Sequence, residues 1–209
     1  MTRRLLIIGA GSFGRELECH LDALPPASRD WRVAGFLDDD PAALEGFPSD
    51  YRILGSIRDF AFSPGDLAVL AIASPAAKQA VATRLTGRVE LLTFVHPTAT
   101  VGKFTRIGEG SVIGPGVVIG PNVTVGAGVF VNSGSMVGHD AVLGDWSSLM
   151  ANVNVAGGCR LGQRVFAAST VTLIPDRKVC DGALLGAGSV VIQDVKEPRT
   201  VFGNPARYL

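Results

Sequence analysis

The chain has 209 residues, enough for one or two domains, and its 19 basic side chains balance 19 acidic ones. A net charge of zero excludes the basic footprint expected of a protein that binds DNA or RNA. No stretch approaches the roughly 20 apolar residues of a membrane span, and the apolar run at residues 5–8 is too short for a signal peptide, so we expect a soluble, cytoplasmic protein. Its three cysteines show no metal-ligand spacing and predict free thiols.

The first 94 residues alternate between strand and helix patterns. A buried strand at residues 5–8 is followed by a glycine-rich turn and by a helix at residues 15–24, which Pro25 and Pro26 end. Further strands are predicted at residues 33–37, 67–73 and 90–95, and a second helix at residues 75–85. This alternation predicts a small parallel sheet covered by helices, so we expect an α/β domain of the half-Rossmann type over residues 1–94.

The glycine turn has the spacing of a dinucleotide-binding fingerprint. Gly9, Gly11 and Gly14 follow a strand and open a helix, where backbone N–H groups can approach a pyrophosphate. Asp38 and Asp39 end the second strand, about where an acidic residue takes a ribose hydroxyl. A tight turn without a ligand is the alternative. About ninety residues suit the binding of one nucleotide, attached to a sugar, rather than a complete nicotinamide dehydrogenase.

From Val95 onwards an aliphatic residue returns every six positions over seventeen hexads, residues 95–196, and Ala167 is the one small residue in the series. The second position of a hexad is often glycine, and the fifth is small or short-branched except at Arg177. Neither a helix nor a strand has this period, which indicates stacked coils. We predict a parallel β-solenoid over residues 95–209, with positions one and five inside and glycine relieving crowded corners, where positive φ is often needed.

The solenoid contains His96 and His139, and the third histidine of the chain, His20, lies in the first predicted helix. We expect His20 to be a surface or packing residue and His96 to serve the junction before Pro97. His139 stands at the third position of its hexad, so it should point outwards with Asp140 beside it. An exposed histidine next to a carboxylate is suited to general-base catalysis, and a solvated polar corner is the alternative.

A triangular solenoid would need three hexads for each coil. Gly157, eighteen positions after His139, would then stack on the histidine. Gly157 and Gly158 would leave backbone N–H groups uncovered beside the imidazole, and such donors can stabilise an oxyanion. This geometry depends on the triangular cross-section, which the period alone does not establish.

With these motifs the chain resembles the left-handed β-helix (hexapeptide-repeat) acyltransferases, and more narrowly the bacterial nucleotide-sugar and sialic-acid-type acetyltransferases with an N-terminal nucleotide-binding domain. The resemblance rests on four segments: G-A-G-S-F-G at residues 9–14, F-L-D-D at 36–39, V-G-H-D-A-V-L-G-D at 137–145, and G-N-P-A-R at 203–207. It spans essentially the whole chain. The hexads and the last segment are typical of acyltransferases in general, and the other three narrow the family.

The resemblance implies transfer of an acetyl group from acetyl-CoA to an amino or hydroxyl group of a nucleotide-linked sugar. It further implies a homotrimer with active sites in grooves between neighbouring β-helices, with acetyl-CoA as co-substrate and no metal. His139 would be the catalytic base, Asp140 its acidic neighbour, and Gly157 the backbone donor to the thioester carbonyl. Substrate-binding residues would be Gly11, Ser12, Phe13, Asp38, Asp39 and Asn132. Coenzyme-binding residues would be Gly157, Gly203, Asn204, Pro205 and Arg207.

The sequence departs from the family pattern in three places. Phe13 stands where members acting on UDP-4-amino sugars can carry histidine, and Ser148 where some carry a second active-site histidine. Ala73-Ser74-Pro75 replaces a more usual glycine and polar pair. These changes retain the base but leave the acceptor sugar open.

Other functions on the same architecture require residues or domains different from these. A γ-type carbonic anhydrase needs several metal-binding histidines around a trimer interface, whereas the solenoid has only His96 and His139. A sugar nucleotidyltransferase needs a larger catalytic domain with a basic glycine-rich start, whereas acidic residues follow the glycine turn here. A covalent route through Cys159 lacks a neighbouring base, and its inward fifth position hides the thiol. A non-catalytic scaffold or sugar-nucleotide-binding module would keep the hexads and the glycine turn without requiring the His139–Asp140 pair.

Overall fold

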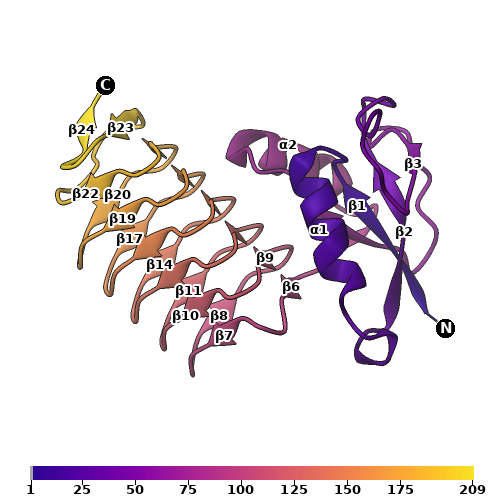
Figure 1. Ribbon diagram of the computed structural model, residues 1–209, viewed down its shortest axis with the longest axis horizontal. Coiled ribbons are helices and arrows are strands. Elements are labelled where there is room, and N and C mark those ends of the chain that lie inside the picture. Colours follow the sequence, from indigo (N-terminus) through magenta and orange to yellow (C-terminus); the bar gives the residue numbers. More distant parts are fainter. Residues whose placement is uncertain (1) are drawn as a thin grey trace. The chain divides into compact units, whose positions relative to one another are not determined.

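The computed structural model describes residues 2–209, which form two compact units. One unit contains the residues up to 73 together with 77–92, and the other contains residues 74–76 together with 93–209. Figure 1 shows the helices in the first of these units and the stacked coils of short strands in the second. No helix within residues 2–209 is both long and apolar enough to cross a membrane.

The first unit is built on a parallel sheet of five strands in the order β3-β2-β1-β4-β5. The strands are β1 (Arg3–Ile8), β2 (Trp31–Leu37), β3 (Ile53–Gly55), β4 (Leu67–Leu70) and β5 (Glu90–Leu91). The helical elements are α1 (Ser12–Asp22), the 3-10 turn η1 (Pro26–Ser28) and α2 (Pro75–Leu85), which belongs to this unit from residue 77 onwards. Because the chain adds β2 and β3 on one side of β1 and β4 and β5 on the other, the strand order reverses at β1, where ligands bind in such sheets.

The sequence located most of these elements but misplaced several boundaries. The strand predicted at residues 67–73 ends at Leu70, and the helix predicted to end at Leu24 ends at Asp22. The helix predicted at residues 75–85 is confirmed, whereas α1 begins at Ser12, three residues before the predicted start, directly after the glycine turn. The single strand predicted at residues 90–95 is wrong. Residues 90–91 pair with β4 in the first unit, whereas Phe94–Val95 is β6, the first strand of the solenoid. The short strand β3 was missed because it follows a long segment without an alternating pattern.

The second unit is a parallel β-solenoid with three faces, and each coil contributes one short strand to each face. Face 1 contains β6 (Phe94–Val95), β9 (Val112–Ile113), β12 (Phe130–Val131), β15 (Ser148–Leu149), β18 (Phe166–Ala167), β21 (Leu184–Leu185), β23 (Thr200–Phe202) and β24 (Arg207–Tyr208). Face 2 contains β7 (Thr100–Val101), β10 (Val118–Ile119), β13 (Met136–Val137), β16 (Asn154–Val155), β19 (Thr172–Leu173) and β22 (Val190–Val191). Face 3 contains β8 (Arg106–Ile107), β11 (Thr124–Val125), β14 (Val142–Leu143), β17 (Arg160–Leu161) and β20 (Lys178–Val179).

The register confirms the triangular cross-section. Met136 of β13 pairs with Asn154 of β16, and Val142 of β14 pairs with Arg160 of β17, so stacked residues are three hexads apart. The hexad aliphatics fill the interior, with the exception of the first coil. There Val95 is 38% and Val101 39% exposed, because β6 and β7 are the edge strands of their sheets and no earlier coil covers them. The prediction that every aliphatic of the series is buried is therefore wrong at this end.

Hydroxyl side chains at the fifth hexad position are satisfied inside the solenoid by a repeated pair of hydrogen bonds. Ser135 Oγ donates to the carbonyl of Met150 at 3.0 Å and accepts the N–H of Val153 at 3.1 Å. Thr105, Ser111 and Ser147 make the corresponding pairs one coil further along the chain. A buried hydroxyl without partners would be costly, so this arrangement explains why the interior position accepts serine as well as alanine and valine.

Two hexad positions at the corners are under different backbone constraints. At the second position the backbones of stacked coils approach closely, and a Cβ on Gly120 would lie 2.7 Å from the nitrogen of His139. Left-handed backbone occurs instead at the fourth position, as at Gly158 with φ +72° and Asp140 with φ +62°. The glycines of the second position therefore relieve crowding, as predicted, while the positive φ lies two residues further along the hexad.

Candidate functional site

His139 and Asp140 lie at a corner of the solenoid, between β13 of face 2 and β14 of face 3. The outward orientation expected for His139 is confirmed, because 68% of its side chain is exposed. Nδ1 of His139 lies 2.7 Å from Oδ2 of Asp140, whose side chain is 56% exposed. Asp140 thus holds the ring through one nitrogen and leaves Nε2 available to a ligand.

Gly157 stacks on the imidazole one coil further along. A Cβ placed on Gly157 would lie 2.6 Å from Nε2 of His139. Within residues 2–209 the N–H of Gly157 has no acceptor, whereas the N–H of Gly158 donates to the carbonyl of His139 at 2.9 Å. The prediction of two uncovered donors is therefore wrong for Gly158, because the N–H of a left-handed corner residue bonds to the preceding coil. One backbone donor remains beside the histidine.

Asn122 belongs to this corner and was not identified from the sequence. Its Nδ2 donates to Oδ1 of Asp140 at 3.1 Å, from the equivalent corner of the preceding coil. The hydrogen bond from His139 and then that from Asn122 hold the pKa of Asp140 below its usual value. The signal was present in the sequence, since Asn122 stands eighteen residues before Asp140, one full coil.

Asn132 does not meet His139 within one chain. It lies at the corner between β12 of face 1 and β13 of face 2, whereas His139 follows β13 at the next corner. Its side-chain Oδ1 accepts the N–H of Ser133 at 2.6 Å. One strand, β13, therefore separates these two predicted site residues within the chain.

Cys159 and Ser148 are both buried. The thiol of Cys159 points into the solenoid and donates to the carbonyl of Ile174 at 3.2 Å. Burial raises the pKa of this thiol. A nucleophilic cysteine needs an exposed thiolate, so Cys159 has the features of a packing residue.

The G-N-P-A-R segment connects β23 to the antiparallel β24 at the last coil. Val190, which begins β22, donates to the carbonyl of Gly203 at 3.0 Å and accepts the N–H of Ala206 at 2.9 Å. β16 and β19 lie between β22 and β13 on face 2, so the segment is not brought next to His139. At about 4.8 Å for each strand step, an extended ligand of about 15 Å would span the two.

The glycine turn and the acidic pair lie together at the carboxyl ends of β1 and β2. Asp38 Oδ2 accepts the N–H of Ala10, inside the turn, at 2.7 Å. Asp39 Oδ1 accepts the N–H of Ile57 at 2.9 Å, and its Oδ2 lies 3.9 Å from Arg84. The structure thus brings the predicted nucleotide-binding residues together, with Asp38 bracing the turn itself.

Each of the three positions in the turn is glycine for a different physical reason. Gly9 has a left-handed φ of +102°, and a Cβ on Gly14 would overlap the carbonyl oxygen of Gly9. A Cβ on Gly11 would meet nothing within 4 Å. Gly11 caps α1, Ser12 beside it is exposed and Phe13 is half-buried in the first turn. The fold therefore requires glycine at residues 9 and 14, whereas no contact within residues 2–209 requires glycine at residue 11.

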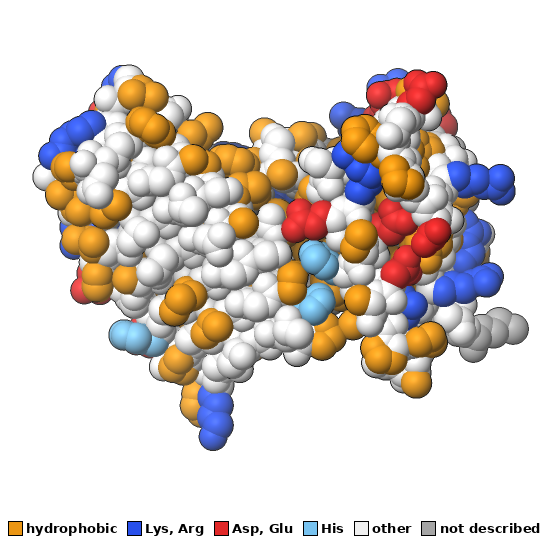
Figure 2. Space-filling model, viewed as in Figure 1, with side chains coloured by type: hydrophobic (Ala, Val, Ile, Leu, Met, Phe, Trp, Pro, Cys, Tyr) orange, Lys and Arg blue, Asp and Glu red, His pale blue; other side chains and the backbone are white. Residues whose placement is uncertain are grey.

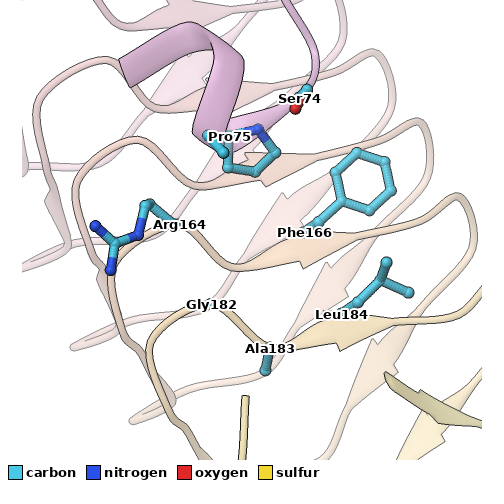
Figure 3. Close-up of a pocket in the computed structure, with 8 residues that line it drawn as sticks. Ser74, Pro75, Arg164, Phe166, Gly182, Ala183 and Leu184 are labelled. Atoms are coloured by element: carbon cyan, nitrogen blue, oxygen red, sulfur yellow. The ribbon is translucent and has the colours of Figure 1, made fainter. Parts of the chain in front are cut away.

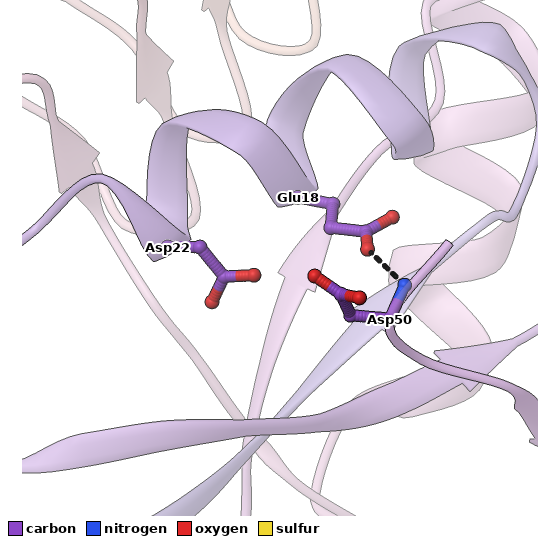
Figure 4. Close-up of side chains that lie close together, drawn as sticks. All are labelled: Glu18, Asp22 and Asp50. Carbon is purple, nitrogen blue, oxygen red and sulfur yellow. Dashed lines mark hydrogen bonds between the residues drawn. The ribbon is translucent and has the colours of Figure 1, made fainter. Parts of the chain in front are cut away.

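Three carboxylates, those of Glu18, Asp22 and Asp50, lie close together between α1 and residues 49–51 (Figure 4). The buried Glu18 accepts the Asp50 N–H at 3.1 Å and the Ser49 hydroxyl at 2.9 Å, and Tyr51 Oη donates to Asp22 at 2.8 Å. Burial, aided by this hydrogen bond, raises the pKa of Tyr51 to about 12. These bonds tie the helix to residues 49–51, a structural role.

The second unit has a pocket of about 390 Å³ on face 1. Phe166 and Leu184 project into it from the neighbouring strands β18 and β21, and Ser74, Pro75 and Arg164 also line it (Figure 3). The solenoid surface in view in Figure 2 carries few charged side chains and scattered hydrophobic ones, while charged side chains gather on the α/β unit. Met136 and Val118, on the outer side of face 2, are among the exposed hydrophobic residues.

The comparisons with known proteins cover both units. Residues 4–85 match the model of the PglD N-terminal domain family. The structure is similar to PerB from Caulobacter crescentus, solved in complex with CoA and GDP-perosamine, with 26% identity, 100% of this chain and 98% of that chain covered, and a TM-score of 0.88.

Two further solved structures match over the full length of both chains. The acetyltransferase domain of PglB from Neisseria gonorrhoeae, in complex with acetyl coenzyme A, is 26% identical with a TM-score of 0.86. WeeI from Acinetobacter baumannii is 25% identical with a TM-score of 0.84. Residues 4–85 thus match the PglD N-terminal domain family, and the whole chain, including its three-faced solenoid, is similar to sugar acetyltransferases of the left-handed β-helix, hexapeptide-repeat type.

Proposed function

We propose that the protein transfers an acetyl group from acetyl-CoA to an amino or hydroxyl group of a nucleotide-linked sugar. The observation that carries the proposal is the corner at which His139, braced by Asp140, exposes Nε2 beside the unpaired N–H of Gly157. Two similar structures support the substrates, since PerB was solved with CoA and GDP-perosamine and the PglB domain with acetyl coenzyme A.

The corner supplies a base and an oxyanion donor. With Nδ1–H donating to the Asp140 carboxylate, Nε2 carries the lone pair and accepts the proton of the sugar amine or hydroxyl as that atom bonds to the acyl carbon. The N–H of Gly157 donates to the thioester oxygen as negative charge grows there. The carbon–sulfur bond then breaks, and the departing thiolate of CoA accepts the proton from the imidazolium.

The remaining predicted residues divide between the two substrates. The glycine turn at the N-terminus of α1 suits the pyrophosphate of the sugar nucleotide, with Gly11 and Ser12 closest to it and Asp38 and Asp39 at the ribose. Residues 203–207 would hold the nucleotide end of the coenzyme. Asn132 and His139 lie at different corners of one chain. In a homotrimer, the Asn132 corner of a neighbouring chain would face the His139 corner and complete each site, and their separation within one chain supports this arrangement.

The test is release of free CoA thiol from acetyl-CoA in the presence of UDP-, dTDP-, GDP- and CMP-linked sugars, each in an amino and a hydroxyl form. His139→Ala is expected to lower turnover by about 10²–10⁴, the usual contribution of a general base, without changing the oligomer measured by light scattering. His96→Ala, a second solenoid histidine, should retain activity.

Two results would contradict the proposal. Near-normal turnover of His139→Ala would remove this residue from the mechanism. Sugar nucleotides that raise the unfolding temperature but never support thiol release would indicate a non-catalytic binding module.

A further inference from the structure

We propose that Asn122 is a positioning residue for catalysis, which fixes the Asp140 carboxylate and through it the tautomer and orientation of His139. This inference rests on the proposed function. It identifies a second coil of the solenoid, one before that of the histidine, as part of the catalytic corner.

The geometry follows from the stacking of equivalent corners. Asn122 and Asp140 both have left-handed backbone, with φ values of 59° and 62°. The N–H of Asn122 donates to the carbonyl of Lys103 at 3.0 Å, and that of Asp140 donates to the carbonyl of Pro121 at 3.1 Å. With their backbones held in the same way, the two side chains project side by side, and Nδ2 of Asn122 reaches Oδ1 of Asp140 at 3.1 Å.

The carboxylate needs this second anchor because it is exposed. An ion pair or hydrogen bond between two exposed side chains contributes little by itself, since water competes and both side chains keep rotational freedom. Here Oδ2 of Asp140 binds Nδ1 of His139 and Oδ1 binds Asn122, so both oxygens are engaged and the plane of the carboxylate is fixed. A fixed acceptor at Nδ1 keeps that nitrogen protonated and leaves Nε2 as the base.

Asparagine tolerates left-handed backbone better than most residues, and this preference alone could explain its presence at a corner. Asn152 provides the comparison within the chain. It has φ +58° and an N–H that donates to the carbonyl of Ser133 at 3.0 Å, which matches the backbone of Asn122. Among residues 2–209 its side chain has no hydrogen-bond partner. Corner geometry therefore accounts for Asn152, whereas the amide of Asn122 is directed at the carboxylate that holds the histidine.

Other charges near this corner are few. On β10, β11, β16 and β17, the strands that stack against β13 and β14, the one charged side chain is that of Arg160. Further along the same corner column lie Lys103, one coil before Asn122, and Asp176, two coils beyond Asp140. All three are retained in the variants below, so a change in pH dependence is attributable to residue 122.

The experiment compares Asn122→Gly with Asn152→Gly. Glycine accepts the left-handed backbone at both positions, so each variant removes an amide without straining the corner. We expect Asn122→Gly to lower kcat about tenfold, the effect of a misplaced base, with KM for both substrates within about twofold. Asn152→Gly should leave kcat and KM unchanged.

A second readout does not depend on activity. Nitrogen-15 NMR of the imidazole rings, with His139 assigned from the His139→Ala spectrum, should show one tautomer in the parent protein and a mixture in Asn122→Gly. Asn122→Asp should shift the acid limb of the kcat profile to higher pH, because a second carboxylate favours the protonated imidazole.

The outcomes separate this inference from the proposed function. Loss of turnover in His139→Ala with parental kcat and ring spectrum in Asn122→Gly would overturn the role of Asn122 alone. Full turnover in His139→Ala would overturn both. Equal losses in the two glycine variants would show that the corner asparagines act only on the fold.

Discussion

The Cα of Gly157 lies against the imidazole of His139, so closely that a Cβ there would stand 2.6 Å from Nε2 and 2.8 Å from Cε1. The backbone of Gly157 does not require glycine, because its φ is outside the left-handed region occupied by Gly158 at +72°. The absent side chain is therefore explained by the histidine ring that occupies its space. The lack of a side chain at Gly157 thus determines where the imidazole of His139 can lie.

Gly157→Ala is predicted to displace the imidazole and to lower turnover about 10²-fold, since an error of about 1 Å in the position of a catalytic group has that effect. Alanine adopts this backbone without strain, so the unfolding temperature should change little. Steady-state kinetics and thermal unfolding measure the two effects.

Gly114→Ala is the control for this substitution. Its new methyl group would meet backbone atoms of the next coil, the nearest at 3.1 Å, and no imidazole. If both variants lost the same activity, the contact between Gly157 and His139 would carry no special importance.

Asp140→Asn is predicted to cost stability in a manner that depends on pH. Hydrogen bonds from His139 and Asn122 lower the pKa of Asp140 in the folded protein, so its contribution is present above the ordinary pKa of about 3.9 and is lost as the pH falls through the lowered value. The difference in unfolding temperature between parent and variant should therefore be largest well above about pH 3.9, and it should disappear as the pH falls below that value and through the lowered pKa.

Because this pair is exposed, the difference in unfolding temperature will be small, and a series of melts across pH in low salt is the appropriate measurement. A difference that grew as the pH fell would contradict the assigned direction of the pKa shift. Turnover at neutral pH should fall as well, because asparagine can present its amide to Nδ1 and favour the wrong tautomer.

Gly11→Ala and Gly14→Ala are predicted to have opposite consequences in the first unit. A methyl group on Gly14 overlaps the carbonyl of Gly9 and should destabilise the unit by about 1–3 kcal/mol, the usual cost of overpacking. A methyl group on Gly11 meets open space, so stability should be retained.

For Gly11→Ala we expect the KM for the sugar nucleotide to rise about tenfold, because the methyl group stands where a backbone must approach a pyrophosphate. The KM for acetyl-CoA should be unaffected. Thermal unfolding and substrate titrations distinguish the two variants, and an unchanged KM for every sugar nucleotide would show that the glycine turn is not the nucleotide site.

The six-residue period was sufficient to predict which side chains enter the solenoid, since Val117, Leu143 and Cys159 are all buried as their hexad positions require. Its failures occur where the environment is not periodic. Val95 and Val101 keep the pattern but are exposed, because the first coil has no neighbour below it. The strand predicted at residues 90–95 is divided between two sheets, because an apolar run does not reveal which partner each half pairs with.

The sequence by itself determined the inward and outward faces of each hexad, and with them the exposure of His139, because these depend on a short local repeat. The tertiary structure decided what stands beside that histidine. Asn122, Asp140 and Gly157 lie around His139 because each coil closes after eighteen residues. The same closure pairs the N–H of Gly158 with the carbonyl of His139 and leaves the N–H of Gly157 without an acceptor within residues 2–209. Contacts between coils depend on how the chain returns over itself, which a local pattern does not specify.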